Sequence, residues 1–160
     1  SCDNRLRERT RICQDGKVPG GIERKNMEEK KAVPREDYCF ACGEANPIGL
    51  HLKFEFVGDT FTTKKTLPRE YQSYTGIVHG GIITTMLDEA MGGYLYKSGK
   101  KAVTARLDVR YRKPTPVGEE LTITGWVESQ RANFVNMKAT IALSDRTITA
   151  EGTAKMAVVE

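Results

Sequence analysis

Apolar and polar residues alternate where the patterned part of the chain begins. In residues 51–57 every second position is apolar, which is the period-two signature of a half-buried strand. The apolar positions are Leu52, Phe54 and Phe56. The Gly58-Asp59 pair is a turn signal, and residues 60–67 offer a second strand. We therefore predict a β-hairpin over residues 51–67.

The spacing becomes helical in residues 76–96. Apolar side chains recur there every three or four positions, which predicts a helix with a wide apolar face. These side chains are Ile83, Met86, Leu87, Ala90, Met91 and Tyr94. Thr84, Thr85 and Asp88 occupy the narrower polar side, and Ser98-Gly99-Lys100 ends the helix.

About four long strands are predicted after the helix, because apolar residues again take alternate positions up to residue 158. In the first of these strands, Leu107 and Tyr111 share the apolar face, and Thr104 lies on the opposite face with several arginines. One helix has to cover six strands, and the simplest packing wraps one strongly curved antiparallel sheet around it. The predicted fold class is therefore α+β.

Residues 1–37 differ from the rest of the chain. They are dense in both charge signs and poor in large apolar groups, and Pro19-Gly20-Gly21 interrupts them. We therefore predict a charged arm over residues 1–37, flexible or loosely packed, and one folded domain over residues 38–160. The arm has no helix-turn-helix pattern.

Composition and charge exclude several classes of function. The chain has 160 residues, of which 39% are hydrophobic and 29% charged, as in an ordinary soluble protein. No apolar run approaches the ~20 residues that span a bilayer, and no secretory leader is visible, so we expect a cytoplasmic protein without membrane contact. The formal net charge of +4 suits a phosphorylated small molecule but is too small to indicate nucleic acid.

Two of the four cysteines, Cys39 and Cys42, form a C-x-x-C pair in the segment CFACG. A zinc site needs two more ligands, and the spacing of Cys2 and Cys13 is not that of a second knuckle. We interpret the pair as small apolar residues in a loop before the first strand. Metal binding and redox chemistry are the alternatives, and we expect neither a metal nor a cofactor.

Gly80 and Gly81 open the predicted helix directly after His79. The first N–H groups of a helix lack intrahelical partners, and glycine lets another group approach the backbone closely. The two glycines therefore indicate an anion or oxyanion site, with the positive end of the helix dipole behind it. Tight packing of the helix start against a strand explains them too. His79 is interpreted as an orienting or capping group rather than as a base.

Two adjacent acids, Asp88 and Glu89, lie in the middle of this apolar helix. Their neighbours indicate that one of them points toward packed surroundings, where a carboxylate needs a partner or a role as general base or nucleophile. From Gly80 to Asp88 is roughly 12 Å along a helix, so one carbonyl group cannot touch both on the same helix. A shared reaction therefore requires a two-fold dimer.

Three segments of the chain resemble the hotdog-fold acyl-CoA thioesterases, in the subfamily that includes the phenylacetate-pathway and 4-hydroxybenzoyl-CoA enzymes. They are CFACGEANPIGL before the first strand, HGGIITTMLDEAMG on the helix and LDVRYRKPTPVGE after it. The similarity covers about residues 38–160. It implies a hotdog fold, in which the sheet curves around one long helix and dimers or tetramers form the site across an interface.

The resemblance also implies roles for single residues. The oxyanion donor of the family is the glycine N–H after the histidine, which is Gly80 here. The family's carboxylate, eight positions further along the helix, is Asp88. A serine or threonine on the next strand positions the water, which implies Thr104. Some relatives hold the water or thioester with Asn or Gln before the histidine loop, where this chain has Ser73 with Gln72 beside it.

In the family, CoA lies along the end of the post-helix strand and the next turn. The residues implicated are Tyr111, Arg112, Lys113, Ser129, Gln130 and Arg131, with Gly81 at the helix start. Basic groups there suit the nucleotide phosphates, although a solvated strand end explains them equally well. The acyl group is not indicated, because its candidate neighbours could equally be core residues. These are Tyr71, Tyr74, Met86, Met91 and Tyr94.

The predicted function is hydrolysis of an acyl- or aryl-CoA thioester to free acid and CoA. The enzyme would be a homodimer or a dimer of dimers, with CoA present only as part of the substrate. The main alternative is a non-catalytic acyl-CoA-binding hotdog domain that acts as a sensor or scaffold, and Asp88 argues for the enzyme. A hotdog hydratase would need a His–Asp pair that His51 and His79 do not supply.

Overall fold

The computed structural model describes residues 35–159. Positions 35–37 of the predicted arm belong to a short helix, α2 (Arg35–Tyr38), and the remainder of the arm lies outside the described residues, with Cys2 and Cys13. No helix of the described part is long and apolar enough to cross a membrane.

Six strands form one antiparallel sheet in the order β1-β2-β4-β5-β6-β3. The strands are β1 (Glu55–Val57), β2 (Thr60–Thr66), β3 (Ala102–Tyr111), β4 (Glu120–Arg131), β5 (Phe134–Ala142) and β6 (Ile148–Val158). The predicted hairpin is confirmed, with Val57 opposite Thr60 and Gly58 in the left-handed conformation that the turn requires. Strands β1 and β3 are the two edges of the sheet.

Strand β1 is shorter than predicted. Residues 51–54 of the expected strand do not pair with β2. His51 has a positive φ of 51°, and its ring nitrogen Nε2 lies 2.6 Å from the carbonyl oxygen of Asn46, so the backbone bends there instead of running straight. Leu52 is nevertheless buried, as its place in the alternation predicts.

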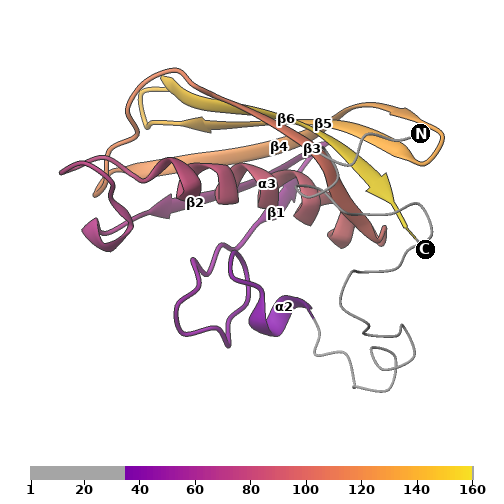
Figure 1. The fold of residues 1–160 in the computed structure, drawn as a ribbon, viewed down its shortest axis with the longest axis horizontal. Coiled ribbons are helices and arrows are strands. Elements are labelled where there is room, and N and C mark those ends of the chain that lie inside the picture. Colours follow the sequence, from indigo (N-terminus) through magenta and orange to yellow (C-terminus); the bar gives the residue numbers. More distant parts are fainter. Residues whose placement is uncertain (1–34, 160) are drawn as a thin grey trace, which may run out of the picture.

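The long helix α3 (Gly80–Lys97) lies along one face of the sheet (Figure 1) and packs mainly against β2 to β6. Its Tyr94 ring also meets Phe56 of β1 edge to face, with ring centroids 5.0 Å apart. Five of its six predicted apolar positions are fully buried, and Tyr94 is half-buried. The closest approach is to Gly125 of β4, where an added Cβ would collide with the backbone carbonyl group of Ala90. The predicted arrangement, one antiparallel sheet around one helix, is therefore confirmed.

A β-bulge in β3 changes which way Thr104 points. Thr104 lies opposite Met156 and Arg106 opposite Lys155, so Ala105 is an extra residue with no partner on β6. Residues directly opposite each other share a face, and Met156 is buried in the core. Thr104 therefore lies on the helix side of the sheet, and the simple alternation that placed it with the arginines was wrong.

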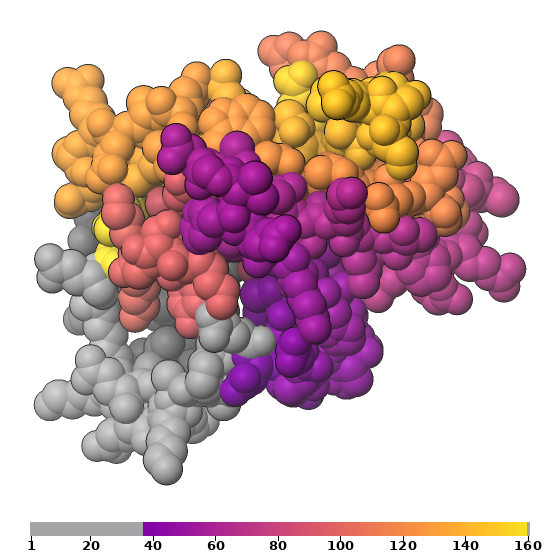
Figure 2. Space-filling model, turned by 180° about the vertical axis from the view of Figure 1, so that it is seen from behind, coloured from indigo at the N-terminus to yellow at the C-terminus, as the bar shows by residue number. Residues whose placement is uncertain are grey.

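The segment before β1 lies on the far side of α3 from the sheet (Figure 1). Its backbone is fixed by two hydrogen bonds of 2.8 Å, from the Leu50 amide to the Phe40 carbonyl and from the Leu52 amide to the Ala41 carbonyl. Figure 2 shows the indigo part of this segment in the lower half of the molecule, with the orange later strands above it. Helix α3 is therefore enclosed between the sheet and the segment before β1.

Candidate active site

His79 caps the N-terminus of α3. Its Nδ1 accepts a hydrogen bond of 2.9 Å from the Gly81 amide, so this N–H is already engaged within the chain. The Gly80 amide, by contrast, donates to no acceptor among residues 35–159. A Cβ at Gly80 would meet only the Tyr111 side chain, at 3.5 Å or more, so there is room beside this amide. Of the two predicted donors, Gly80 is the one available to a ligand.

Tyr111, at the end of β3, lies against the start of α3. Its hydroxyl donates to the Gly80 carbonyl oxygen over 3.0 Å and lies 2.7 Å from the Thr84 hydroxyl. The Thr84 hydroxyl is also 3.0 Å from the same carbonyl oxygen. These contacts attach the first turn of the helix to the edge strand. Tyr111, predicted to contact CoA, is thus also a structural neighbour of Gly80.

Asp88 lies two turns further along the same side of α3. The Thr104 hydroxyl donates a hydrogen bond of 2.8 Å to its Oδ1. Both residues are accessible, since Asp88 is half-buried and Thr104 exposed. The structure thus brings together the carboxylate and the hydroxyl that the resemblance paired.

One row of α3 therefore faces strand β3. Gly80, Thr84 and Asp88 are four residues apart and share one side of the helix. Tyr111 contacts the beginning of this row and Thr104 its end. Because Gly80 and Asp88 are roughly 12 Å apart along the axis, one chain presents the two groups separately.

The loop before α3 forms a small hairpin. Gln72 is bridged to Val78, and the Ser73 amide donates to the Ile77 carbonyl over 2.8 Å. A shallow groove of about 430 Å³ lies beside this hairpin and the helix start. It is lined by Glu70, Tyr71, Gln72, His79, Gly81, Ile82 and Thr85. Gln72, rather than the neighbouring Ser73, is the side chain at the groove.

The predicted CoA contacts fall into two groups at opposite ends of the sheet. Tyr111 pairs with Ala150, whereas Ala102 at the other end of β3 pairs with Val158, next to the β4–β5 turn that follows Arg131. At about 3.3 Å per residue, the length of β3 separates the groups by roughly 30 Å. They do not meet within one chain.

All of the predicted CoA-contacting side chains are exposed, and four of them have partners. Tyr111 contacts Gly80 and Thr84 as described above, and Gln130 Oε1 accepts a hydrogen bond of 3.4 Å from Lys100. Arg112 Nε lies 2.9 Å from a carboxylate oxygen of Glu151, and the Ser129 hydroxyl accepts a hydrogen bond of 3.0 Å from Asn136. Lys113 and Arg131 are exposed as well. Among the suggested acyl neighbours, Met86 and Met91 belong to the core, Tyr74 is largely exposed and Tyr94 packs against the rings of β1 and β2. Tyr71 is therefore the one at the groove.

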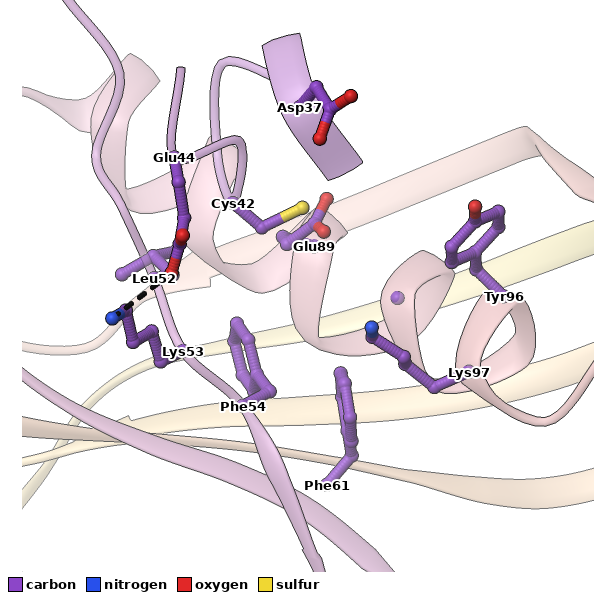
Figure 3. Close-up of a pocket in the computed structure, with 11 residues that line it drawn as sticks. Asp37, Cys42, Glu44, Leu52, Lys53, Phe54, Phe61, Glu89, Tyr96 and Lys97 are labelled. Carbon is purple, nitrogen blue, oxygen red and sulfur yellow. Dashed lines mark ion pairs between the residues drawn. The ribbon is translucent and has the colours of Figure 1, made fainter. Parts of the chain in front are cut away.

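Glu89, the second acid of the helix, points to a different side of α3 from Asp88, toward the segment before β1, and is buried. The Cys39 thiol lies 3.9 Å from its Oε2, and Cys42 lines the same pocket (Figure 3). Burial, reinforced by the nearby Glu89 carboxylate, raises the pKa of the Cys42 thiol. Sequence reasoning did not connect Glu89 with the cysteines, because their contact spans fifty residues and no local spacing indicates it.

Known proteins resemble this chain in sequence and in fold. The family described as the thioesterase superfamily matches residues 75–150, a segment that runs from the loop before α3 into β6. The match includes Gly80, Asp88 and Thr104. The predicted resemblance to this superfamily is confirmed.

A curated relative is the acyl-coenzyme A thioesterase THEM4 of Mus musculus. It is 30% identical to this chain over 84 residues, which cover 52% of this chain and 36% of the mouse protein. The chain therefore matches about a third of the length of this relative.

Solved structures confirm the hotdog fold. A thioesterase superfamily protein of known crystal structure has a TM-score of 0.69 and 29% identity, over 72% of this chain and 60% of that one. A hypothetical thioesterase from Streptococcus pneumoniae, solved with coenzyme A, has a TM-score of 0.63 and 23% identity, over 67% of this chain and 84% of that one. The Streptococcus protein has also been crystallised with single alanine replacements of an aspartate and of a threonine, sixteen positions apart.

Proposed function

We propose that this chain is a hotdog protein of the thioesterase superfamily and hydrolyses an acyl-CoA thioester in a site shared by two copies of the chain. The Gly80 amide of one copy binds the thioester carbonyl oxygen. Asp88 of the other copy activates the water, and Thr104 aligns Asp88. The observation that carries the proposal is that the free edge strand β3 contacts both halves of this machinery.

The relatives support this choice of residues. In the Streptococcus thioesterase, the aspartate and threonine replaced by alanine are sixteen positions apart, which is also the separation of Asp88 and Thr104. That protein was solved with coenzyme A. The shared separation and the direct hydrogen bond favour the same pairing here.

Strand β3 supports the shared site because its outer edge is open. Nine of its ten residues pair with β6, all on one side, and the strand exposes Val103 and Tyr111, which are 48% and 57% accessible. A long open edge with apolar side chains invites pairing with another strand. A second copy of β3 is a natural partner, because a two-fold axis makes two identical edges antiparallel.

Antiparallel pairing of β3 with its copy would bring the two half-sites together. If the axis passes near Leu107 and Asp108, midway along the strand, Thr104 of one copy lies opposite Tyr111 of the other. Thr104 contacts Asp88, and Tyr111 contacts Gly80. Each Asp88 would then face the Gly80 amide of the neighbouring copy, so that every dimer has two complete sites.

The same arrangement suits CoA. The ends of β3 exchange positions across the axis, so Arg131 of one copy would lie near Arg112 and Lys113 of the other. Within one chain these residues are at opposite ends of the sheet. Together they would form a basic surface for the nucleotide phosphates, in which arginine can bind phosphate oxygens in pairs.

The chemistry consumes one water and one thioester. Asp88 accepts a proton from water as the oxygen attacks the carbonyl carbon, and the Gly80 N–H stabilises the negative oxygen that forms. The carbon–sulfur bond then breaks, the CoA sulfur takes up the proton, and the free acid leaves. Direct attack by Asp88, followed by hydrolysis of the resulting anhydride, gives the same products.

Mixing two inactive variants tests the shared site. Gly80→Pro removes the N–H, and proline is well tolerated at the first position of a helix. Asp88→Asn removes the base. Each variant alone should release almost no thiol from a panel of short, medium, long and aryl acyl-CoA substrates. After co-refolding at equal amounts, about a quarter of the wild-type activity should return, because half of the dimers are mixed and each has one intact site.

Gly80→Ala is the matched control, because it keeps the N–H and its methyl group fits beside Tyr111. It should remain active. No recovery in a mixture shown to contain mixed dimers would refute the shared site, and a chain that sediments as a monomer at assay concentration would do the same. Binding of acyl-CoA by the wild-type protein without thiol release would favour the non-catalytic alternative.

A further inference from the structure

We propose that Cys39, Cys42 and Glu89 form a binding site for a zinc ion, between α3 and the segment before β1. One ligand atom from each of the three residues lies within 4.8 Å of the other two. This inference does not depend on the proposed function, since none of the three residues has a part in the hydrolysis described above.

The spacing of these atoms is close to that of a tetrahedral site. With bonds of about 2.3 Å to sulfur and about 2.0–2.2 Å to oxygen, neighbouring ligand atoms around zinc are roughly 3.5–3.8 Å apart. The Cys39 sulfur is already 3.9 Å from the Glu89 oxygen Oε2. Rotation of the Cys39 and Cys42 side chains is therefore enough to close the site.

The backbone holds the two cysteines in a tight turn. The Gly43 amide donates to the Cys39 carbonyl over 2.8 Å, and a Cβ at Gly43 would collide with the Cys39 amide nitrogen. The carbonyl groups of Phe40 and Ala41, between the cysteines, are bonded to the segment that leads to β1. The turn is thus set before an ion arrives, as in a C-x-x-C knuckle.

Glu89 makes this cluster different from an ordinary pair of loop cysteines. Its side chain is only 5% exposed and comes from the middle of α3, far from the cysteines in sequence. Figure 3 shows the Cys42 sulfur pointing toward the Glu89 carboxylate in a pocket that Asp37 and Lys97 also line. A divalent cation would offset the cost of placing negative ligands in so buried a position.

The donor set favours zinc over the hard cations. Thiolate ligands select zinc and related metals, whereas magnesium, calcium and manganese prefer oxygen alone. Two sulfurs and one carboxylate leave a fourth position for water or for Asp37, which lines the same pocket. The bound ion would tie the segment before β1 to the centre of α3.

Cobalt is a spectroscopic probe for this site. The reduced full-length chain, freed of metal with a chelator, should bind one Co²⁺ per chain with the charge-transfer absorption of cobalt–thiolate bonds, and Zn²⁺ should displace it. The double variant C39S/C42S should lose this absorption. Glu89→Gln should keep it while weakening cobalt binding at least tenfold. The double variant C2S/C13S is the matched control and should behave as the wild type.

Several results would overturn the zinc site. The wild type could lack the cobalt–thiolate absorption at one equivalent of cobalt, or this absorption could persist in C39S/C42S or disappear in C2S/C13S. A Cys39–Cys42 disulfide, together with no metal uptake by the reduced protein, would also refute the site. If C39S/C42S does not fold, alkylation of the wild-type cysteines with and without zinc, measured by mass spectrometry, tests the site instead. Zinc should then protect Cys39 and Cys42, but not Cys2 and Cys13, from alkylation, and equal labelling of all four would refute the site.

Discussion

The hydroxyl group of Thr104 donates a 2.8 Å hydrogen bond to Oδ1 of Asp88, and joins the edge strand β3 to the middle of helix α3. The hydroxyl has one hydrogen to donate, and it donates it in a hydrogen bond to Oδ1, so the other carboxylate oxygen can accept a hydrogen bond from water. The pair is also the point at which a bulge in the sheet and a polar residue of the helix meet.

Asp88→Asn should lower kcat for thioester hydrolysis by about 10²–10⁴-fold, because the amide cannot take a proton from water. KM and the unfolding temperature should change little, since Asp88 is only half-buried. Thiol release under saturating acyl-CoA measures the effect. Asp59→Asn, the same change in the exposed β1–β2 turn, is the control, and equal activity of the two variants would contradict the role of Asp88.

Thr104→Ala should reduce kcat on the order of tenfold, the effect expected from losing one hydrogen bond to a charged group. Thr104→Ser keeps the hydroxyl and should retain most of the activity. Steady-state kinetics of the two variants, with circular dichroism to compare their folds, separates positioning from packing. A serine variant as impaired as the alanine variant would argue against the hydrogen bond as the cause.

Gly125→Ala should destabilise the fold by about 1–3 kcal/mol, because the new methyl group collides with the Ala90 carbonyl and α3 has to shift from β4. Denaturant unfolding measures the loss. Gly152→Ala is the comparison, since a Cβ there meets Met91 and Leu87 at ordinary distances of 3.4–3.5 Å. A greater loss of unfolding free energy from Gly152→Ala than from Gly125→Ala would show that the approach of Gly125 to Ala90 is not the tighter constraint.

The Cys42 thiol of the metal-free, reduced chain should react slowly with iodoacetamide. Burial and the Glu89 carboxylate raise its pKa above the ordinary value of 9.0, so less of the reactive thiolate is present at pH 8 than in the unfolded chain. The protonated thiol therefore stabilises the fold below pH 9, and this stabilisation is lost as the pH rises toward the higher pKa of the folded state.

Peptide mapping of the alkylation rate between pH 7 and 10, for native and urea-unfolded chain, measures this shift. Glu89→Gln removes the part of the pKa increase that the carboxylate causes, and it should bring the alkylation rate of native Cys42 closer to that of the unfolded chain. Native Cys42 that reacts as fast as the unfolded thiol would show that its pKa is not raised.

Much of the fold could be predicted because its pattern is local. The three- and four-residue spacing of α3 and the two-residue spacing of the strands depend only on which side faces the core. Ile83 and Leu121 are buried for that reason. The late start of the first strand was different, since the positive φ of His51 turns the backbone without any change in the apolar pattern.

The candidate site was only partly accessible to sequence reasoning. The rise of a helix sets the distance between Gly80 and Asp88, and that distance alone predicts a dimer if both groups serve one reaction. The face of Thr104 could not be inferred from alternation, because one unpaired residue, Ala105, shifts the register. The contact between Glu89 and Cys39 depends on how the segment before β1 folds back over α3, and no short-range pattern contains that information.

The backbone contact between Gly125 and Ala90 has a consequence for substrate choice. At that level the helix rests directly on the sheet, and the surrounding side chains of Met86, Met91 and Ile123 are completely enclosed. An aliphatic or aromatic acyl group therefore has no space to insert between these core side chains. Under the proposed function, selectivity for one carbon skeleton over another would be decided in the shallow groove around Tyr71 and Gln72, and exchange of this loop should change it without altering the core.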